Sequence, residues 1–312
     1  MTDIVTLTMN PCVDVSTSTE RVQPTRKLRC AAPKYEPGGG GINVARVLHR
    51  LGADVLALYP AGGDSGARLE RLLEAEQVPA LRVPIAGETR ESMHVWELSA
   101  RQEYRFVMPG PTLAEAEWQR CLERVTALQP FPRYLVASGS LPPGVPADFY
   151  ARLARLARLR GARLVLDASG PALAAALQAG VFLVKPSLGE LRALTGLALE
   201  NRTQWCAAAQ QLVRQGQAEV VVLSLGEEGA LLVTAAGVTL APALPVAVHS
   251  AVGAGDSLVG GLLQALAAGA DVRQAFVRGV AAASAALLAS GTGLCQPADV
   301  ERLQAQVSLQ DL

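Results

Sequence analysis

The regular alternation of short apolar runs with amphipathic segments of helical period constrains the fold most strongly. Apolar runs typical of buried strands lie at Ile4–Met9, Val55–Pro60, Tyr134–Ala137, Arg163–Asp167, Phe182–Val184 and Val220–Ser224. Helical patterns lie among them at Ile42–Leu51, Ala67–Glu76, Leu113–Leu128, Ala147–Arg160, Leu188–Leu194 and Thr203–Gln215. Strands that alternate with helices predict a mostly parallel sheet covered on both faces. We therefore expect a three-layer α/β/α, doubly wound fold.

Two segments interrupt this alternation. Residues 13–34 and 90–107 alternate polar and apolar side chains without a helical pattern of their own. We predict that they form a small antiparallel sheet that projects from the main body as a lid. Later in the chain a hairpin pattern at Ala230–Val233 and Val238–Ala241 precedes two apolar helices, Gly255–Ala268 and Val272–Ala289, and a last helix near Pro297. With 312 residues and no linker-like stretch, we expect residues 1–312 to form one domain.

Composition excludes several classes of function. Twenty-eight basic residues balance 28 acidic ones without a basic stripe, so we expect no nucleic-acid partner. The least charged stretch, Gly279–Ala298, is interrupted by serine, glycine and proline, so we expect no membrane span. The cysteines are scattered, the histidines have no metal-ligand spacing, and no signal peptide precedes the first strand pattern. These features predict a cytoplasmic protein with reduced cysteines and no protein-bound zinc.

The strongest local motif is Ala251-Val252-Gly253-Ala254-Gly255-Asp256-Ser257, directly before an apolar helix. Small residues allow a ligand to approach the backbone, and the first N–H groups of a helix point outward unpaired, so this turn could bind an anion. Asp256 could accept a proton from an attacking hydroxyl in the same turn. An ordinary helix cap explains the heptapeptide equally well when it is taken alone.

Glycines also enter an earlier helix, in Glu36-Pro37-Gly38-Gly39-Gly40-Gly41-Ile42-Asn43-Val44-Ala45-Arg46. This run could let a ligand lie against bare backbone, and it could also be the hinge of the lid. Its spacing is not that of a Rossmann loop, and the chain has no GxxxxGK[ST] phosphate loop. A third motif, Ser224-Leu225-Gly226-Glu227-Glu228-Gly229, could bind nucleotide at a strand end, although a plain hairpin turn explains it better in isolation.

The order of the motifs is more informative than any one of them. Asn10–Asp14, the glycine run, Ser138–Gly144, Lys185–Glu190, the Ser224 turn and Gly253–Asp256 follow one another along the chain. This series resembles the ribokinase-like, or PfkB-type, carbohydrate kinase family over essentially the whole sequence. The resemblance is closest to the bacterial minor-type 6-phosphofructokinases, through Asn10–Asp14, Lys27–Cys30, Glu36–Arg46, Tyr104–Gly110 and Ser138–Gly144.

The resemblance implies phosphoryl transfer from ATP to a sugar hydroxyl. Asp256 would be the catalytic base, and the N–H groups of Gly253, Ala254 and Gly255 would hold the developing charge. The sugar hydroxyls would be bound by Asp14, Gly38, Gly39 and Asn43, and the phosphate already on the sugar by Lys27, Arg29, Arg90, Arg105 and Ser140. For Arg105 alone, keeping an exposed strand soluble is the simpler interpretation. Lid sheets pair in this family, so we expect a homodimer in which Lys27 or Arg29 serves the neighbouring site.

The resemblance also implies a nucleotide site with its metal ions. ATP phosphates and ribose would lie near Lys185, Ser224, Gly226 and Gly229, and the adenine near Ala282 and Ser284. Magnesium would arrive with ATP, with Glu190 as an outer carboxylate. A potassium site would use the carbonyls of Ser250, Val252, Ala286, Ala289, Gly291 and Gly293. The chain departs from the family at Ser187, where an asparagine would contact nucleotide or metal-bound water, and at Gly293, where relatives carry a larger basic side chain.

We expect fructose 6-phosphate to be phosphorylated at its 1-hydroxyl, giving fructose 1,6-bisphosphate for glycolysis, because Lys27-Leu28-Arg29 favours this sugar phosphate. Members with nearly the same motifs use fructose 1-phosphate or tagatose 6-phosphate instead. The alternative from another class is a non-catalytic sensor of sugar phosphate or nucleotide. Ser187 makes a sensor conceivable, and the intact Gly255-Asp256 pair argues against it.

Overall fold

The computed structural model describes residues 2–289, 291 and 293–312. Its main sheet has the strand order β14-β13-β12-β11-β10-β9-β8-β1-β4-β5. The strands from β11 to β5 run parallel: β1 (Ile4–Leu7), β4 (Val55–Ala61), β5 (Ala80–Pro84), β8 (Tyr134–Ser138), β9 (Arg163–Asp167), β10 (Val181–Val184) and β11 (Ala218–Ser224). An antiparallel meander of β12 (Ala230–Thr234), β13 (Gly237–Ala241) and β14 (Gln310–Asp311) extends one edge.

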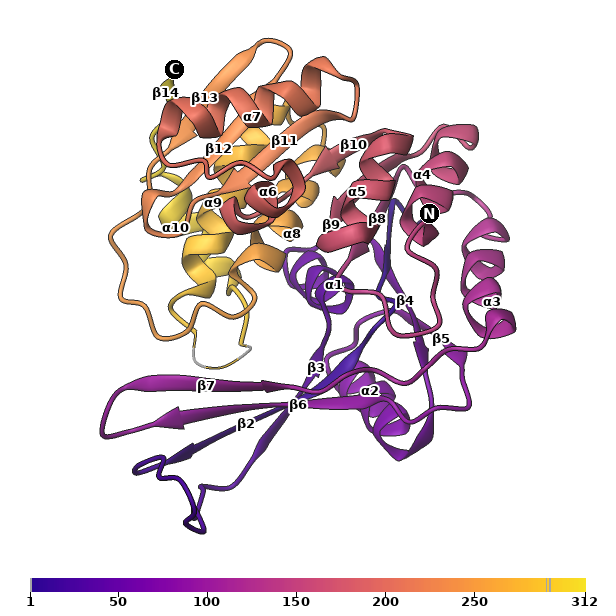
Figure 1. The fold of residues 1–312 in the computed structure, drawn as a ribbon, viewed down its shortest axis with the longest axis vertical. Coiled ribbons are helices and arrows are strands. Elements are labelled where there is room, and N and C mark those ends of the chain that lie inside the picture. The colour runs from indigo at the N-terminus through magenta and orange to yellow at the C-terminus, as the bar shows by residue number, and fades with distance from the viewer. Residues whose placement is uncertain (1, 290, 292) are drawn as a thin grey trace.

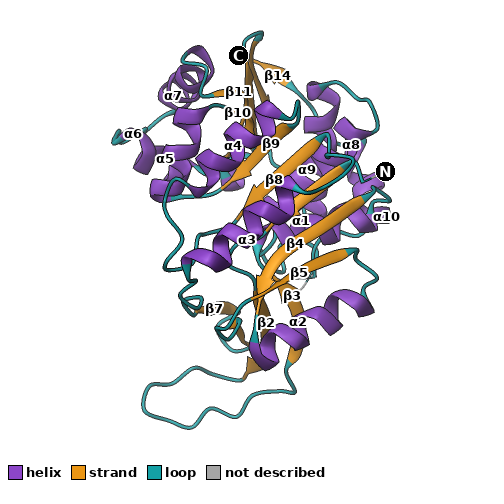
Figure 2. Ribbon diagram, turned by 90° about the vertical axis from the view of Figure 1, so that its right-hand side faces the viewer, coloured by secondary structure: helices purple, strands orange, loops and turns teal. Residues whose placement is uncertain are grey.

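Helices cover both faces of the main sheet, as Figure 2 shows. One face carries α1 (Gly40–Arg50), α2 (Gly63–Ala75), α8 (Ala254–Ala267) and α9 (Val272–Ala286), with α10 (Pro297–Gln304) against α9. The other carries α3 (Glu115–Thr126), α4 (Phe149–Leu159), α5 (Gly170–Ala179), α6 (Leu188–Thr195) and α7 (Arg202–Arg214). Strand residues enter the two cores alternately: in β8, Tyr134 and Val136 face one core and Leu135 and Ala137 the other. The predicted three-layer, mostly parallel fold is confirmed.

A small sheet projects from the main body (Figure 1). Its strands lie in the order β3 (Lys34–Gly38), β2 (Cys12–Thr19), β6 (Arg90–Glu97) and β7 (Gln102–Val107). The prediction that this sheet is purely antiparallel is wrong, because β2 and β6 run parallel. β2 follows β1 and β6 follows β5, so both strands leave the parallel main sheet from the same edge and enter the small sheet in the same direction.

Most predicted elements are present within a few residues of their expected ends, and the differences have physical reasons. The edge strand β5 contains the charged Arg82, and β14 is very short, so neither has the apolar run of a buried strand. Helix α5 was not predicted because it is apolar on nearly all sides and lacks a polar stripe. Helix α9 ends at Ala286, three residues before the predicted Ala289. All five cysteines are free, and no helix of the described residues has the length and apolar character needed to cross a membrane.

The topology opens a crevice at the carboxyl ends of the parallel strands. Strand β1 lies between β4 and β8, so the chain proceeds outward from β1 in opposite directions. Open α/β sheets bind ligands outside the strand ends at such a switch point. Helix α1 begins there: a Cβ on Gly40 would overlap the Ser138 hydroxyl at the end of β8, and one on Gly41 would crowd the carbonyl of Leu7 at the end of β1.

Candidate active site

Asp256 lies in the first turn of α8, at the edge of the crevice. The N-cap, Gly253, has a φ of 75°, and a Cβ there would overlap the side chain of Leu294, so the turn requires glycine for both its conformation and its packing. The amide of Ser257 donates to the Gly253 carbonyl at 2.8 Å and starts the helix. The carboxylate is therefore carried on a rigid element, next to N–H groups that no helical carbonyl faces.

The predicted anion-binding amides differ in what they face. The N–H of Ala254 is directed at the Ala251 carbonyl, 3.4 Å away, whereas Gly255 lies one residue further into the first turn of α8. The ammonium of Lys185 is close to Gly255, because a methyl group on this glycine would stand 3.3 Å from Nζ. A glycine amide, the start of a helix dipole and a lysine ammonium thus converge near Asp256, an arrangement suited to a phosphate group.

Asn43, in the first turn of α1, is the direct partner of Asp256. Its Nδ2 donates to Oδ2 of Asp256 at 2.9 Å, across two helices that come from opposite ends of the chain. Its Oδ1 accepts from Nη1 of Arg46 at 3.3 Å. Both ends of the Asn43 amide therefore have protein partners, and its role in sugar binding stays a prediction.

The surroundings of Asp256 make it a stronger base than an ordinary carboxylate. Burial and the neighbouring carboxylate of Asp167 raise the pKa of Asp256 to about 7, against the hydrogen bond from Asn43 and the charge of Lys185. The carboxylate of Asp14 contributes in the same direction as Asp167. A base whose pKa lies near neutrality is well suited to take a proton from a hydroxyl at physiological pH.

Asp14 lies on β2 of the small sheet and is buried. Gly38 lies against it, since a Cβ at Gly38 would overlap the Asp14 carboxylate. The thiol of Cys12 donates to Oδ1 of Asp14 at 3.1 Å, and Nε2 of His94 is 3.8 Å from the same oxygen. Gly39, with a φ of 107°, is the N-cap of α1 and packs against Thr8. The structure thus gathers Asp14, Gly38, Gly39 and Asn43 beside Asp256.

The predicted phosphate-binding residues are divided between two places. The guanidinium of Arg90 donates to the carbonyls of Asn10 (3.0 Å) and Met108 (3.2 Å), and Nδ2 of Asn10 donates to Oγ of Ser140 at 3.0 Å. Arg90 and Ser140 are therefore joined through Asn10 at the base of the small sheet. Arg105 has an exposed side chain on β7.

Lys27 and Arg29 are not part of this group. Both lie in the exposed loop between β2 and β3, at the tip of the small sheet (Figure 1). The described contact of Arg29 is through its backbone, whose carbonyl accepts from Oγ1 of Thr19 at 3.1 Å. Within one subunit, no described contact joins either cation to the residues that surround Asp256.

Asp167 is a site residue that the sequence did not single out. It ends β9, and its Oδ1 lies 3.1 Å from Nζ of Lys185, which follows the neighbouring strand β10. Burial acts to lower the pKa of Lys185, but the facing Asp167 outweighs it and raises this pKa, so the side chain stays an ammonium. An aspartate at the carboxyl end of a parallel strand was the available signal.

A cavity of about 540 Å³ lies beside the start of α8. Its wall includes four of the predicted nucleotide residues: Ser224, Gly226, Gly229 and Ser284. Gly226 and Gly229 have positive φ, and a Cβ at Gly229 would overlap the Ala241 carbonyl. The volume is that of a small-ligand site, and most of the lining is apolar, as an adenine ring requires.

Ala282 is not among the residues that line this cavity. It is fully buried between α9 and α8, where a Cβ on Gly261 would overlap its methyl group. Val280, Ala283 and Leu287 of the same helix region take the place expected for it.

Ser187 and Glu190 form a capping box at the start of α6. The Ser187 hydroxyl accepts from the amide of Glu190 at 3.2 Å, and Oε2 of Glu190 accepts from the amide of Ser187 at 2.7 Å. Serine is as good an N-cap as the asparagine of the family pattern. The departure at Ser187 therefore keeps the helix start, and only Oε2 of Glu190 is used in the capping box.

The predicted potassium ligands lie around the loops before α8 and after α9. Gly293 already accepts a hydrogen bond from Nη1 of Arg50 at 2.6 Å, and the carbonyl of Ala286 accepts from the amide of Ala289 at 3.1 Å. A carbonyl oxygen has two lone pairs, so a potassium ion bound here would share the Gly293 oxygen with a guanidinium. Among the described residues, no group of three or more His, Cys, Asp or Glu side chains could hold a metal ion.

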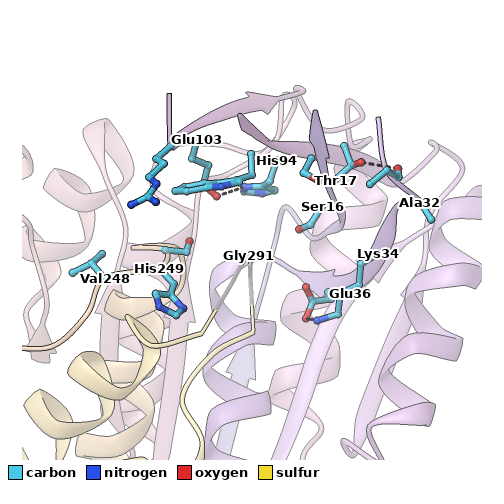
Figure 3. Close-up of a pocket in the computed structure, with 15 residues that line it drawn as sticks. Ser16, Thr17, Ala32, Lys34, Glu36, His94, Glu103, Val248, His249 and Gly291 are labelled. Carbon is cyan, nitrogen blue, oxygen red and sulfur yellow. Dashed lines mark hydrogen bonds and ion pairs between the residues drawn. The ribbon is translucent and has the colours of Figure 1, made fainter. Parts of the chain in front are cut away.

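A second cavity, of about 660 Å³, separates the small sheet from the main body (Figure 3). Ser16 and His94 line it from the small sheet, and His249 and Gly291 line it from the opposite side. The two cavities share Val248. They lie on either side of the segment before α8, where Ser250 lines the cavity under the small sheet and Ala254 and Gly255 line the apolar one. Each cavity has the volume of a small-ligand site.

An aspartate in the first turn of a helix, with a lysine ammonium near that turn, on a mostly parallel sheet that carries a small projecting sheet, defines a phosphotransferase of the ribokinase-like class. The model of the pfkB family of carbohydrate kinases matches residues 3–299, and the chain belongs to this family.

The relatives agree with this assignment. The chain is 46% identical over 299 residues to the ATP-dependent 6-phosphofructokinase isozyme 2 of Mycobacterium tuberculosis, a match that covers 96% of this chain and 88% of that protein. Crystal structures of phosphofructokinase-2 from Escherichia coli with potassium and with fructose-6-phosphate have TM-scores of 0.94 and 0.93 and identities of 43% and 42%, each covering 98% of this chain and 99% of that one. The 1-phosphofructokinase of Xanthomonas campestris is 36% identical over 266 residues, 84% of this chain and 83% of that protein.

Proposed function

We propose that the protein transfers the γ-phosphoryl group of ATP to the 1-hydroxyl of fructose 6-phosphate and forms fructose 1,6-bisphosphate. The observation that carries this proposal is the carboxylate of Asp256, which Asn43 holds at the start of α8 and whose pKa is raised to about 7. Similarity to two 6-phosphofructokinases of the minor type supports the choice of substrates. Similarity to carbohydrate kinases supports a role in sugar metabolism, and we propose the cytoplasm as the location.

In the proposed reaction, Asp256 takes the proton as the hydroxyl oxygen forms its bond to the γ-phosphorus, and the bond to the β-phosphate oxygen breaks to release ADP. Asp14, Gly38, Gly39 and Asn43 would surround the sugar hydroxyls. Arg90 and Ser140 would bind the phosphate that the sugar already carries. Lys185 and the amides of Gly253, Ala254 and Gly255 would stabilise charge on the transferred group.

We propose magnesium from the chemistry of ATP and potassium from a complex of a related enzyme. Magnesium would arrive on ATP, bound mainly to phosphate and water, with Glu190 as an outer carboxylate, and would neutralise phosphate charge. The potassium complex of the E. coli relative supports a monovalent cation near the carbonyls of Ser250, Val252, Ala286, Ala289, Gly291 and Gly293, with the last shared with Arg50.

We further propose that residues 1–312 work as one kinase domain, with segments 13–34 and 90–107 as its lid, and that two lids pair in a homodimer. Ser16, Lys34 and His94 line the cavity under the small sheet, so their sequence neighbours point to its outer face. There Tyr35, Met93 and Phe106 are 38%, 37% and 49% exposed, in one row across the strands. Pairing would cover this apolar row and bring Lys27 or Arg29 to the neighbouring crevice.

The substrate is tested by measuring ADP release with fructose 6-phosphate, fructose 1-phosphate and tagatose 6-phosphate under identical conditions. We expect the highest kcat/KM with fructose 6-phosphate. The 36% identity to a 1-phosphofructokinase makes fructose 1-phosphate the informative competitor. A higher kcat/KM with that sugar would replace the substrate but keep the kinase, and absence of ADP with every sugar phosphate would favour a sensor.

The catalytic role of Asp256 is tested by Asp256→Asn, which keeps the shape of the side chain but cannot take the proton. We expect turnover to fall by about 10²–10⁴-fold, the usual contribution of a general base. Asp299→Asn is the matched control, because Asp299 also lies in the first turn of a helix, α10, but pairs with Arg302 at the surface. Near-normal turnover of Asp256→Asn would remove this residue from the mechanism.

A further inference from the structure

Arg46, on α1, is the largest fully buried side chain that the proposed reaction leaves without a role. Its exposed fraction is 0%, and a buried guanidinium needs partners for all of its donors. Nε and Nη2 donate to the carboxylate of Glu76, at the end of α2, at 2.9 and 2.6 Å. Arg50, one turn further along α1, donates to the same carboxylate at 3.2 Å. Burial alone would raise the pKa of Glu76, but the two arginines lower it, so its charge is kept.

The remaining donor of Arg46 is directed toward the site. Nη1 donates to the backbone carbonyl of Pro37 at 2.9 Å and to Oδ1 of Asn43 at 3.3 Å. Pro37 directly precedes Gly38, the glycine that lies against Asp14. One side chain thus joins the end of β3, the first turn of α1 and the end of α2, just behind the residues that surround Asp256.

The chemistry of a guanidinium decides which way the Asn43 amide faces. Arginine has donors only, so the Asn43 atom beside Nη1 must be the oxygen. The amide nitrogen then faces Oδ2 of Asp256, where it donates at 2.9 Å. If the amide were reversed, its nitrogen would face the donor Nη1 of Arg46, and its oxygen would face the carboxylate oxygen of Asp256. Both hydrogen bonds would then be lost.

We propose that Arg46 is a positioning residue of the kinase: anchored by Glu76, it orients the Asn43 amide so that its nitrogen holds the catalytic carboxylate of Asp256. This inference rests on the proposed role of Asp256 as the base. It assigns catalytic importance to a buried ion pair that would otherwise serve only to join α1 to α2.

The test is a double-mutant cycle on kcat with fructose 6-phosphate and saturating ATP, using Arg46→Met, Asn43→Ala and the double variant. We expect Arg46→Met alone to lower kcat about 10–100-fold, the scale measured for residues that orient a first contact. In the Asn43→Ala background, Arg46→Met should change kcat by no more than about twofold, because the amide through which Arg46 acts has already been removed.

The pH profile of kcat/KM provides a second measurement, which a purely structural role of Arg46 would leave unchanged. The hydrogen bond from Asn43 lowers the pKa of Asp256, so losing its orientation should shift the acidic limb of the kcat/KM profile to higher pH in Arg46→Met. Asn43→Ala should shift the limb in the same direction. Equal kcat losses from Arg46→Met in both backgrounds, together with an unmoved limb, would overturn the proposal.

Arg82→Met is the matched control. Arg82 also pairs with a glutamate of α2, Glu70, at 2.8 Å and donates to a backbone carbonyl, that of Ala61, at 3.1 Å. It has no contact with Asn43 or Asp256 among the described residues, so kcat and the pH limb should stay unchanged. A matching loss of kcat in Arg82→Met would show that breaking any arginine–glutamate pair on α2 is sufficient.

Removing Arg46 leaves the partly buried carboxylate of Glu76 with Arg50 alone, and Arg46→Met could fail to fold. Arg46→Lys keeps the charge but loses the planar fork, so the same cycle with Arg46→Lys decides the question. Thermal unfolding of each variant reports the loss of stability separately from kcat. The failure modes are distinct. Absence of ADP release with every sugar phosphate would overturn the proposed function, and an active Asp256→Asn would overturn the role of Asp256 as the base. An inactive Asp256→Asn with independent effects of Arg46 and Asn43 would overturn the positioning role alone.

Discussion

At the scale of single residues, Asp256 shows how one environment serves two requirements. Burial and the nearby Asp167 and Asp14 carboxylates raise its pKa, which makes it a more competent base. The amide of Asn43 and the ammonium of Lys185 keep the ionised form accessible. The balance of these effects places the pKa at about 7, where an isolated aspartate would be fully ionised and a poor proton acceptor.

A pH profile should report this balance. The profile of kcat/KM for the sugar phosphate reflects ionisations of the free enzyme, so we expect it to rise with pH and to level off above an apparent pKa of about 7. The sign follows because Asp256 must be deprotonated to act as a base. Initial rates between pH 5 and 9, with stability of the enzyme checked at each pH, measure the limb. A profile that stays level down to pH 5 would contradict the raised pKa.

At the scale of elements, the small sheet has one polar face over the crevice and one partly apolar outer face. This division follows from strand alternation, since Ser16, Lys34 and His94 face the cavity while Tyr35, Met93 and Phe106 face outward. The outer row includes β7, an edge strand with exposed apolar side chains. Such an edge invites pairing with another chain unless it is covered.

Phe106→Lys tests the proposed pairing of lids. A lysine at this position would place a charge at the β7 end of the apolar row, where the edge strand would meet its partner, so we expect the dimer dissociation constant to rise at least about tenfold. Leu159→Lys is the control, because Leu159 is 83% exposed at the end of α4, on the main body. Light scattering after size-exclusion chromatography over a range of concentrations gives the mass. An unchanged dimer in Phe106→Lys would locate the interface elsewhere.

The same scale shows how far the sequence could predict the structure. Local patterns were sufficient for the parallel sheet and for both glycine-lined helix starts. They also placed Asp256 in the first turn of a helix, but its role as the base came from the family resemblance and stays a prediction. They could not give the parallel pairing of β2 with β6, because strand direction depends on which edge of the main sheet each segment leaves. Asp167 was missed because only the neighbouring register of β9 and β10 places it beside Lys185. Local sequence also says nothing of the tip position of Lys27 and Arg29.

At the scale of the whole molecule, ionisation of the buried Asp256 lowers the free energy of unfolding as the pH rises above the acidic range. Between its ordinary pKa of 3.8 and about 7, the folded state binds more protons at Asp256 than the unfolded state. The free energy of unfolding therefore decreases as pH rises through this window. Asp256 thus trades stability for a reactive carboxylate, and Asp256→Asn should relieve the cost.

We expect Asp256→Asn to be more stable than the natural protein by about 1–3 kcal/mol at pH 8, with a smaller difference at pH 5. Urea unfolding at the two pH values, followed by circular dichroism, measures the difference. Asp299→Asn should change the free energy of unfolding by less than about 0.5 kcal/mol, as surface substitutions usually do. Equal stability of Asp256→Asn and the natural protein at pH 8 would mean that burial and the neighbouring carboxylates do not destabilise the ionised form of Asp256.

The bond between Asn43 and Asp256 joins residues separated by 213 positions, one early in the chain and the other near its end. A nascent chain that lacks α8 would have Asn43 without Asp256, the proposed base. Closing so long a loop is entropically costly until the intervening sheet has assembled, so this contact belongs to the late stages of folding. If Asp256 is the base, turnover would report that the molecule is completely assembled, and we expect a partly synthesised chain to be inactive.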